Sequence, residues 1–298
     1  MLPAVRLRSA ALALVTVALV GLTVSCGANS GGKSAAGKVR VVTSLDLFAD
    51  FIQHVGGERV QVTALVPADA DPHTYEPVPS QAAKVADADL IVINGVGLEQ
   101  TLHNLIYNNV RGGVQIAQMS DGLPVVADNP HLWLNVQYAM HYVESVRDGL
   151  IAADPAGADV YRSNAAAYLT ELDTLDKQTA AAIETIPPDR RKLITYHDAF
   201  PYLAQRYGLE VVGVVVQSEG SEPSAQDLAR LLDEIRAQHI PVVFAGPEFN
   251  SQLLDTVARE AGAQVKMLLS DTYADNIHSY VGLIGFDAQQ LVEGLGSS

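Results

Sequence analysis

A chain of 298 residues with one cysteine and a formal net charge of −15 excludes several classes of protein. One cysteine cannot form an internal disulfide or a thiolate metal site, so any metal site must use histidine and carboxylate side chains. The acidic balance argues against nucleic-acid binding, because that function needs a basic face.

The N-terminal end is predicted to be a lipoprotein signal peptide covering residues 1–25. Arg6 and Arg8 precede an apolar stretch from residue 11 to residue 20. This stretch is too short for a membrane-spanning helix, which needs about 20 residues. Small residues then lead to Cys26, which we expect to carry a lipid after cleavage. A plain secretory signal followed by an unmodified cysteine is the alternative.

Residues 26–38 are predicted to form a flexible tether, because glycine and serine are frequent in this segment. The segment from Gly27 to Ser34 also matches the phosphate-loop pattern. That pattern requires a strand before it and a helix after it, whereas here it follows a signal peptide and leads into glycine-rich chain. We therefore do not expect nucleotide binding.

Strands and helices alternate from residue 39 to residue 154, which we predict to be an N-terminal α/β lobe. Valine and isoleucine mark the strands expected at residues 40–44, 60–66, 90–94 and 114–118. Helices are expected between them at residues 46–55, 80–88 and 97–109. This alternation is typical of a parallel sheet covered by helices.

One long helix is predicted to join two lobes over residues 155–187. Apolar residues recur near helical spacing between Leu169 and Ile183, and Pro187 and Pro188 end the pattern. A helix of this length spans about 45 Å. Since one helix is a stiffer link than a pair of crossover strands, we expect limited domain closure.

The alternation returns in residues 188–298, the predicted C-terminal lobe. Strands are expected at residues 193–196, 211–216, 242–245 and 265–269. Helices are expected at residues 202–207, 224–238 and 251–261. The predicted fold class is α/β, with two lobes that each contain a mostly parallel sheet flanked by helices.

Two short segments each place a histidine directly after a proline. They are residues 71–77, which include His73, and residues 129–135, which include His131. Proline fixes its own φ and restricts the residue before it, so both histidines lie in stiff turns. Neutral imidazole is a common metal ligand, and we interpret both residues as candidate ligands.

Two further candidate ligands come from the C-terminal lobe. His197 directly follows the strand expected at residues 193–196, and Asp271 follows the one expected at residues 265–269. Ligand sites in open α/β sheets gather at the carboxyl ends of strands, and three imidazoles with one carboxylate suit tetrahedral zinc. A site between the lobes is therefore predicted. The remaining histidines are expected to be surface or packing residues: His54, His103, His141, His239 and His278.

The chain resembles a known family, the zinc- and manganese-binding solute-binding lipoproteins of ABC importers. A series of motifs from about residue 39 onward carries the resemblance: residues 71–77, 88–90, 94–99, 129–135, 197–200, 207–209, 243–245 and 270–271. The resemblance implies that the metal ligands are His73, His131, His197 and Asp271. It also implies a long helix that joins two lobes.

In this family a histidine as the third ligand resembles the zinc type, and a glutamate there the manganese type. Imidazole suits zinc, whereas carboxylate and water suit manganese, so His197 favours Zn2+. Mn2+ or Fe2+ is the alternative, because ion availability outside the cell also selects the metal. The histidine-rich loop of many zinc members is absent between His73 and His131. Asn129 and Asn135 stand where family members usually carry aspartates, and neither is a ligand in the family.

The resemblance implies an extracytoplasmic protein that captures the ion and delivers it to a cognate ABC permease driven by an ATPase. We expect a monomer without enzyme activity, anchored by lipid to the outer face of the cell membrane. A zinc metallohydrolase with Glu76 as its general base is an alternative, although four protein ligands would leave no position open for water. A surface adhesin is a further alternative, because family members are sometimes called adhesins.

Overall fold

Two parallel sheets organise the computed structural model, which describes residues 37–68, 70–216, 223–247, 251–274 and 276–296. The predicted signal peptide and Cys26 lie outside the described residues. Within the described part, no helix combines the length and the apolar character needed to cross a membrane. Residues 33–298 make up one compact unit by their own contacts.

The first sheet has parallel strands in the order β2-β1-β3-β4. Its strands are β1 (Val39–Thr43), β2 (Val60–Ala64), β3 (Leu90–Ile93) and β4 (Gln115–Gln118). Val41 lies opposite Val62 in β2 and Leu90 in β3. All four residues of β3 are buried, because helices cover both faces of the sheet and apolar side chains must fill both.

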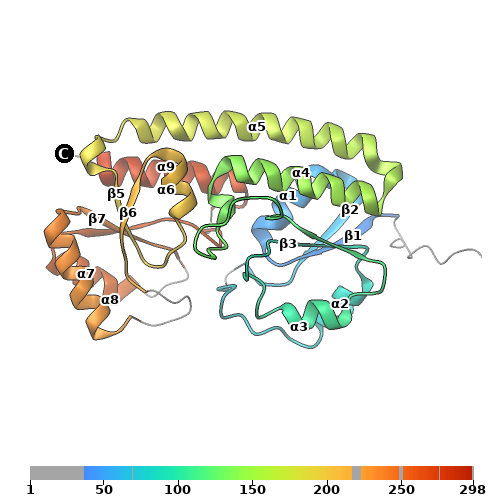
Figure 1. Cartoon of the computed structure of the whole chain (residues 1–298), viewed down its shortest axis with the longest axis horizontal. Coiled ribbons are helices and arrows are strands. Elements are labelled where there is room, and N and C mark those ends of the chain that lie inside the picture. The colour runs from blue at the N-terminus through green and yellow to red at the C-terminus, as the bar shows by residue number, and fades with distance from the viewer. Residues whose placement is uncertain (1–36, 69, 217–222, 248–250, 275, 297–298) are drawn as a thin grey trace, which may run out of the picture. The chain divides into compact units, whose positions relative to one another are not determined.

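The helices of the first sheet are α1 (Asp46–Gly56), α2 (Gln81–Asp87), α3 (His103–Asn109) and α4 (Val136–Ala153). Helix α1 packs on β1 and β2, and α4 packs on β3 and β4, while α2 and α3 lie on the opposite side of the sheet (Figure 1). The predicted start of α3 at Gly97 is wrong. Gly95, Val96 and Gly97 have φ values of 88°, 52° and 81°, which a right-handed helix cannot include.

The second sheet repeats the strand order of the first, as β6-β5-β7-β8. Its strands are β5 (Lys192–Thr195), β6 (Glu210–Val214), β7 (Val242–Ala245) and β8 (Gln264–Met267). Its helices are α6 (Pro201–Tyr207), α7 (Ala225–Gln238), α8 (Ser251–Glu260) and α9 (Tyr280–Gly296). The strands of both sheets are confirmed to within two residues at each end, because valine and isoleucine mark them clearly.

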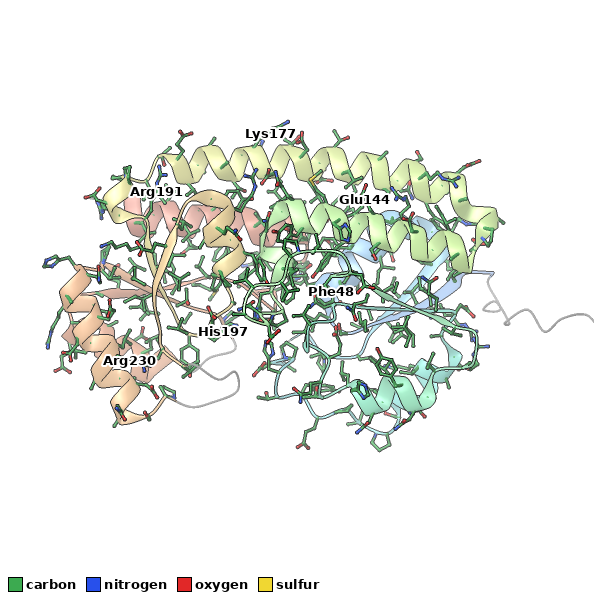
Figure 2. The ribbon with its side chains drawn as sticks, viewed as in Figure 1. Phe48, Glu144, Lys177, Arg191, His197 and Arg230 are labelled. Carbon is green, nitrogen blue, oxygen red and sulfur yellow. The ribbon has the colours of Figure 1, made fainter. Side chains whose placement is uncertain are left out.

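The long helix predicted between the two sheets is α5 (Ala158–Glu184), with 27 residues and a length of about 40 Å. It contacts α1 and α4 before it in the chain, and α6 and α9 after it (Figure 1). Its buried face includes Leu172 and Ile183, whereas Lys177 points outward (Figure 2). The helix begins later than predicted because Pro155–Gly157 form a 3-10 turn. We call the chain before α5 the first half and the chain after it the second half.

Aromatic side chains join the two halves in the core. Phe48 of α1 lies 5.2 Å from Trp133, and Phe51 lies 4.8 Å from Tyr280 at the start of α9, measured between ring centroids. The Tyr280 hydroxyl donates to the Trp133 carbonyl at 2.7 Å, and the Trp133 indole N–H donates to the Ser270 carbonyl at 2.9 Å. The residues between β4 and α4 are therefore held against the second half.

Candidate metal centre

His73 lies in the loop after β2, in a turn formed with Asp71 and Pro72. The Asp71 Oδ1 atom accepts the backbone N–H of His73 at 2.9 Å, and Oδ2 accepts the Thr74 hydroxyl at 3.0 Å. A side chain that bonds the backbone two residues later closes an Asx turn, and Pro72 stiffens it. The turn that carries His73 is therefore held by its own side chains.

His131 lies in a second turn of the same kind, between β4 and α4. Asn129 Oδ1 accepts the backbone N–H of His131 at 3.0 Å and lies 3.0 Å from His131 Nδ1. Just before this turn, Ala127 and Asp128 have φ values of 49° and 57°. Residues with a Cβ atom adopt this left-handed region only when their surroundings impose it. The chain is thus bent sharply where it presents His131, whose side chain is fully buried.

The two remaining candidate ligands stand close to strand ends. His197, labelled in Figure 2, follows β5, and its carbonyl accepts hydrogen bonds from the Thr195 hydroxyl at 2.9 Å and the Ala199 N–H at 3.0 Å. Asp271 follows β8, and its Oδ2 atom accepts the Ser270 hydroxyl at 2.7 Å. These loops are short, so the second sheet itself positions both side chains.

The four predicted ligands converge in the structure. One ligand atom from each of them lies within 4.8 Å of the other three, and this is the one group of three or more His, Cys, Asp or Glu side chains with such geometry among the described residues. The Nε2 atoms of His73, His131 and His197 lie 3.7, 3.4 and 3.3 Å from a carboxylate oxygen of Asp271. Tetrahedral bonds of about 2.0–2.2 Å to zinc separate the ligand atoms by roughly 3.3–3.6 Å. The spacing therefore fits one transition-metal ion.

The protonation states also suit a cation. Burial lowers the pKa of His131, and Asp271 opposes this effect. Burial alone would raise the pKa of Asp271, but the imidazoles, with His131 foremost, hold it well below its usual value. One negative charge thus faces three nitrogen ligands. His73 keeps 10% side-chain exposure and forms the outer edge of the group.

Buried residues behind the His131 turn belong to the motif of residues 94–99, to which sequence reasoning assigned no role in the site. Asn94, which follows β3, donates from Nδ2 to the Pro130 carbonyl at 3.0 Å, and its Oδ1 accepts the Tyr142 hydroxyl. Glu99 accepts the Asn94 N–H and the Ser44 hydroxyl, each at 2.8 Å. Burial raises the pKa of Glu99. A polar residue at the end of the apolar run of β3 was the available signal for Asn94.

The other histidines stand outside the group of four, as predicted. His54 pairs with Asp50 at 3.2 Å, and His141 Nε2 lies 2.8 Å from the Asp121 carbonyl oxygen. His103 and His278 are exposed, and His239 ends α7 with a φ of 54°. Glu76, the base of the metallohydrolase alternative, is also exposed and outside the group.

Comparison with known proteins gives a consistent result. The family model described as zinc-uptake complex component A, periplasmic, matches residues 41–294. The manganese-binding lipoprotein MntA of Halalkalibacterium halodurans is 33% identical over 287 residues, covering 94% of this chain and 92% of that protein. The iron-binding protein YfeA of Yersinia pestis is 29% identical and covers 97% of each chain.

Solved structures show the same fold. The periplasmic zinc-binding protein TroA of Treponema pallidum superposes with a TM-score of 0.80 at 27% identity, over 87% of this chain and 99% of that one. Relatives that are 27–33% identical to this chain are thus named for manganese, iron or zinc.

Proposed function

Because the chain belongs to the zinc-uptake complex component A family, the metal-binding components of ABC importers, we propose that His73, His131, His197 and Asp271 bind Zn2+ as cargo. The observation that carries this proposal is the convergence of the four side chains within 4.8 Å. They come from four separate loops, two in each half of the chain. Packing alone does not account for this convergence, since moving polar groups out of water is unfavourable.

Zinc is the ion that the donor set supports best. Three imidazole nitrogens and one carboxylate are typical of zinc, whereas manganese prefers oxygen ligands. The separations of 3.3–3.7 Å between Nε2 atoms and Asp271 oxygens agree with a small tetrahedral ion. Mn2+ or Fe2+ is the alternative cargo, because relatives named for these ions share 33% and 29% identity with the chain.

The route of the ion follows from the family. We infer that the chain works outside the cytoplasmic membrane as a monomer, anchored through a lipid on Cys26, and passes the ion to a permease with its ATPase. The name lipoprotein of the Halalkalibacterium relative supports the anchor. We further propose a division into lobes at residues 39–154 and 188–298. Helix α5, which contacts both halves, would limit their closure.

A competition titration tests the function. The chain from residue 27 keeps the whole compact unit of residues 33–298, so it is suitable for the experiment. It is freed of metal and titrated with Zn2+ and Mn2+, singly and together. We expect one ion per chain and displacement of Mn2+ by an equal concentration of Zn2+. A preference for Mn2+ would overturn the zinc assignment, and binding of neither ion would overturn metal capture.

A further inference from the structure

The Asn129 side chain touches both ligand-bearing regions of the site. Its Oδ1 atom accepts the His131 N–H at 3.0 Å and lies 3.0 Å from Nδ1 of the same residue. Its Nδ2 atom donates to the carbonyl of Asp198, the residue directly after His197. The residue is buried, with 7% exposure. One amide therefore contacts the turn of one ligand and the neighbour of another.

The orientation of this amide is determined by its backbone partners. The His131 N–H can only donate, and the Asp198 carbonyl can only accept, so Oδ1 must face the former and Nδ2 the latter. Because Oδ1 is only an acceptor, the nearby Nδ1 atom of His131 must carry the ring proton. The lone pair of the neutral ring then lies on Nε2, the atom 3.4 Å from Asp271 Oδ1.

The contact also crosses between the two halves of the chain. Asn129 lies between β4 and α4 in the first half, whereas Asp198 lies between β5 and α6 in the second. The carbonyl of Asn129 accepts the Tyr202 hydroxyl of α6 at 2.7 Å, which holds the same residue from its backbone. In the matching turn of His73, the second carboxylate oxygen of Asp71 instead accepts the Thr74 hydroxyl, which belongs to the same turn.

We propose that Asn129 is a positioning residue that fixes the tautomer of His131 and ties its turn to the loop of His197. The inference rests on the proposed function, because it assumes that these histidines bind the ion. The role needs an acceptor and a donor on the same side chain, and an amide has both.

Although family members usually carry an aspartate at this position, in this chain an aspartate would lose the hydrogen bond to the Asp198 carbonyl. It could accept from the backbone and the ring of His131, but its second oxygen would face the Asp198 carbonyl without a proton between them. A carboxylate partner generally makes a histidine ligand more basic and strengthens metal binding. Here the loss of the tie between the halves should outweigh that gain.

The test compares Asn129→Asp with the matched control Asn135→Asp. Asn135 caps α4 by accepting the Gln137 N–H at 3.0 Å, a role that aspartate fills equally well. Zinc release is followed with an excess of a coloured chelator. We expect release from Asn129→Asp to be about 10–100-fold faster than from the unchanged chain. Release from Asn135→Asp should change by less than about twofold.

Two readouts separate positioning from general damage to the fold. The visible absorption bands of bound Co2+ report ligand geometry, and they should shift in Asn129→Asp but not in Asn135→Asp. The 15N resonances of the His131 ring in the metal-free chain should show the proton on Nδ1, and Asn129→Ala should lose this preference. If Asn129→Asp does not fold, Asn129→Ser supplies the comparison, since serine can accept from His131 but cannot reach Asp198.

The role of Asn129 and the proposed function can fail separately. If the unchanged chain binds no ion, the proposed function fails. If the unchanged chain binds zinc and Asn129→Asp releases it equally slowly, the proposed role of the Asn129–Asp198 contact in holding the ion is wrong. A ring proton on Nε2 of His131 in the metal-free chain overturns the tautomer assignment.

Discussion

The two halves of the molecule present their ligands in different ways. In the second half, β5 ends at Thr195 and β8 at Met267, and the ligands His197 and Asp271 follow closely. The short loops leave little freedom, so hydrogen bonds of the sheet hold the ligands in place. The second sheet therefore acts directly as the support of its two ligands.

In the first half the ligands stand far from the strands. Strand β2 ends at Ala64 and β4 at Gln118, whereas the ligands are His73 and His131. Each of these histidines follows a proline and donates its backbone N–H to the side chain two residues before it. In this chain, both long loops therefore hold their histidine through a turn that a side chain closes.

The largest effect is expected from removing one ligand in each half. Structural zinc sites with four ligands have binding free energies of about 10–16 kcal/mol, so each ligand contributes roughly 2.5–4 kcal/mol. His73→Ala and His197→Ala should therefore each weaken zinc binding by about a hundred- to a thousandfold. Calorimetric titration measures both, with the exposed His103→Ala as the control. A loss below tenfold for His73→Ala would remove His73 from the proposed site.

The next prediction changes the chemistry of a ligand and keeps its position on the second sheet. His197→Glu replaces an imidazole with the carboxylate that manganese prefers. The ratio of zinc to manganese affinity should fall by about tenfold or more, equal to about 1.4 kcal/mol. Competition between the two ions measures the ratio, and His103→Glu controls for added charge. An unchanged ratio would show that this position does not select the metal.

The side chains that hydrogen-bond to the backbone of the ligands should differ in importance between the two halves. Asp71→Ala removes the acceptor of the His73 N–H and should weaken zinc binding by about tenfold, whereas Asp71→Asn keeps it and should not. In the second half, Thr195→Val removes the hydroxyl bond to the His197 carbonyl. It should lower stability by about 1 kcal/mol and change zinc affinity by less than about threefold. Equal losses of affinity in Asp71→Ala and Thr195→Val would contradict the contrast between the halves.

The smallest effect is expected where the halves meet away from the site. Asp50 of α1 accepts the Tyr280 N–H at the start of α9 at 2.9 Å, and it also pairs with His54. The hydrogen bond that the His54 ring donates to the Asp50 carboxylate raises the pKa of His54. The stabilisation is therefore complete below pH 6.5, the ordinary value, and is lost as the pH rises through the raised value of the folded chain.

Urea unfolding of the metal-free chain on both sides of this pH window measures the effect. The loss of stability on raising the pH should be smaller in His54→Gln than in the unchanged chain, by about 0.3–0.5 kcal/mol, because the His54 side chain is 39% exposed and solvent screens the pair. His103→Gln should behave like the unchanged chain. A larger loss in His54→Gln would reverse the sign and contradict the assignment.

Local patterns predicted most of the fold. Valine or isoleucine occurs in each strand of the two described sheets. The signal is strongest in β3 and β7, which are buried throughout and need apolar side chains on both faces. The pattern failed at the start of α3, where Val96 adopts a left-handed conformation that its side chain disfavours. The bounds of α4 and α9 were not assigned. Their buried faces are completed by α5, which lies far from α9 in the sequence.

The sequence by itself determined which side chains could bind a metal and placed two of them in stiff turns. A single cysteine excluded thiolates, and each proline stiffens the turn that carries its histidine, both of which are local properties of the chain. Only the tertiary structure decided that the four ligands meet, and that the Asn129 amide joins His131 to Asp198. These contacts depend on the packing of two sheets against α5, since no local rule relates the ends of strands so far apart in the chain.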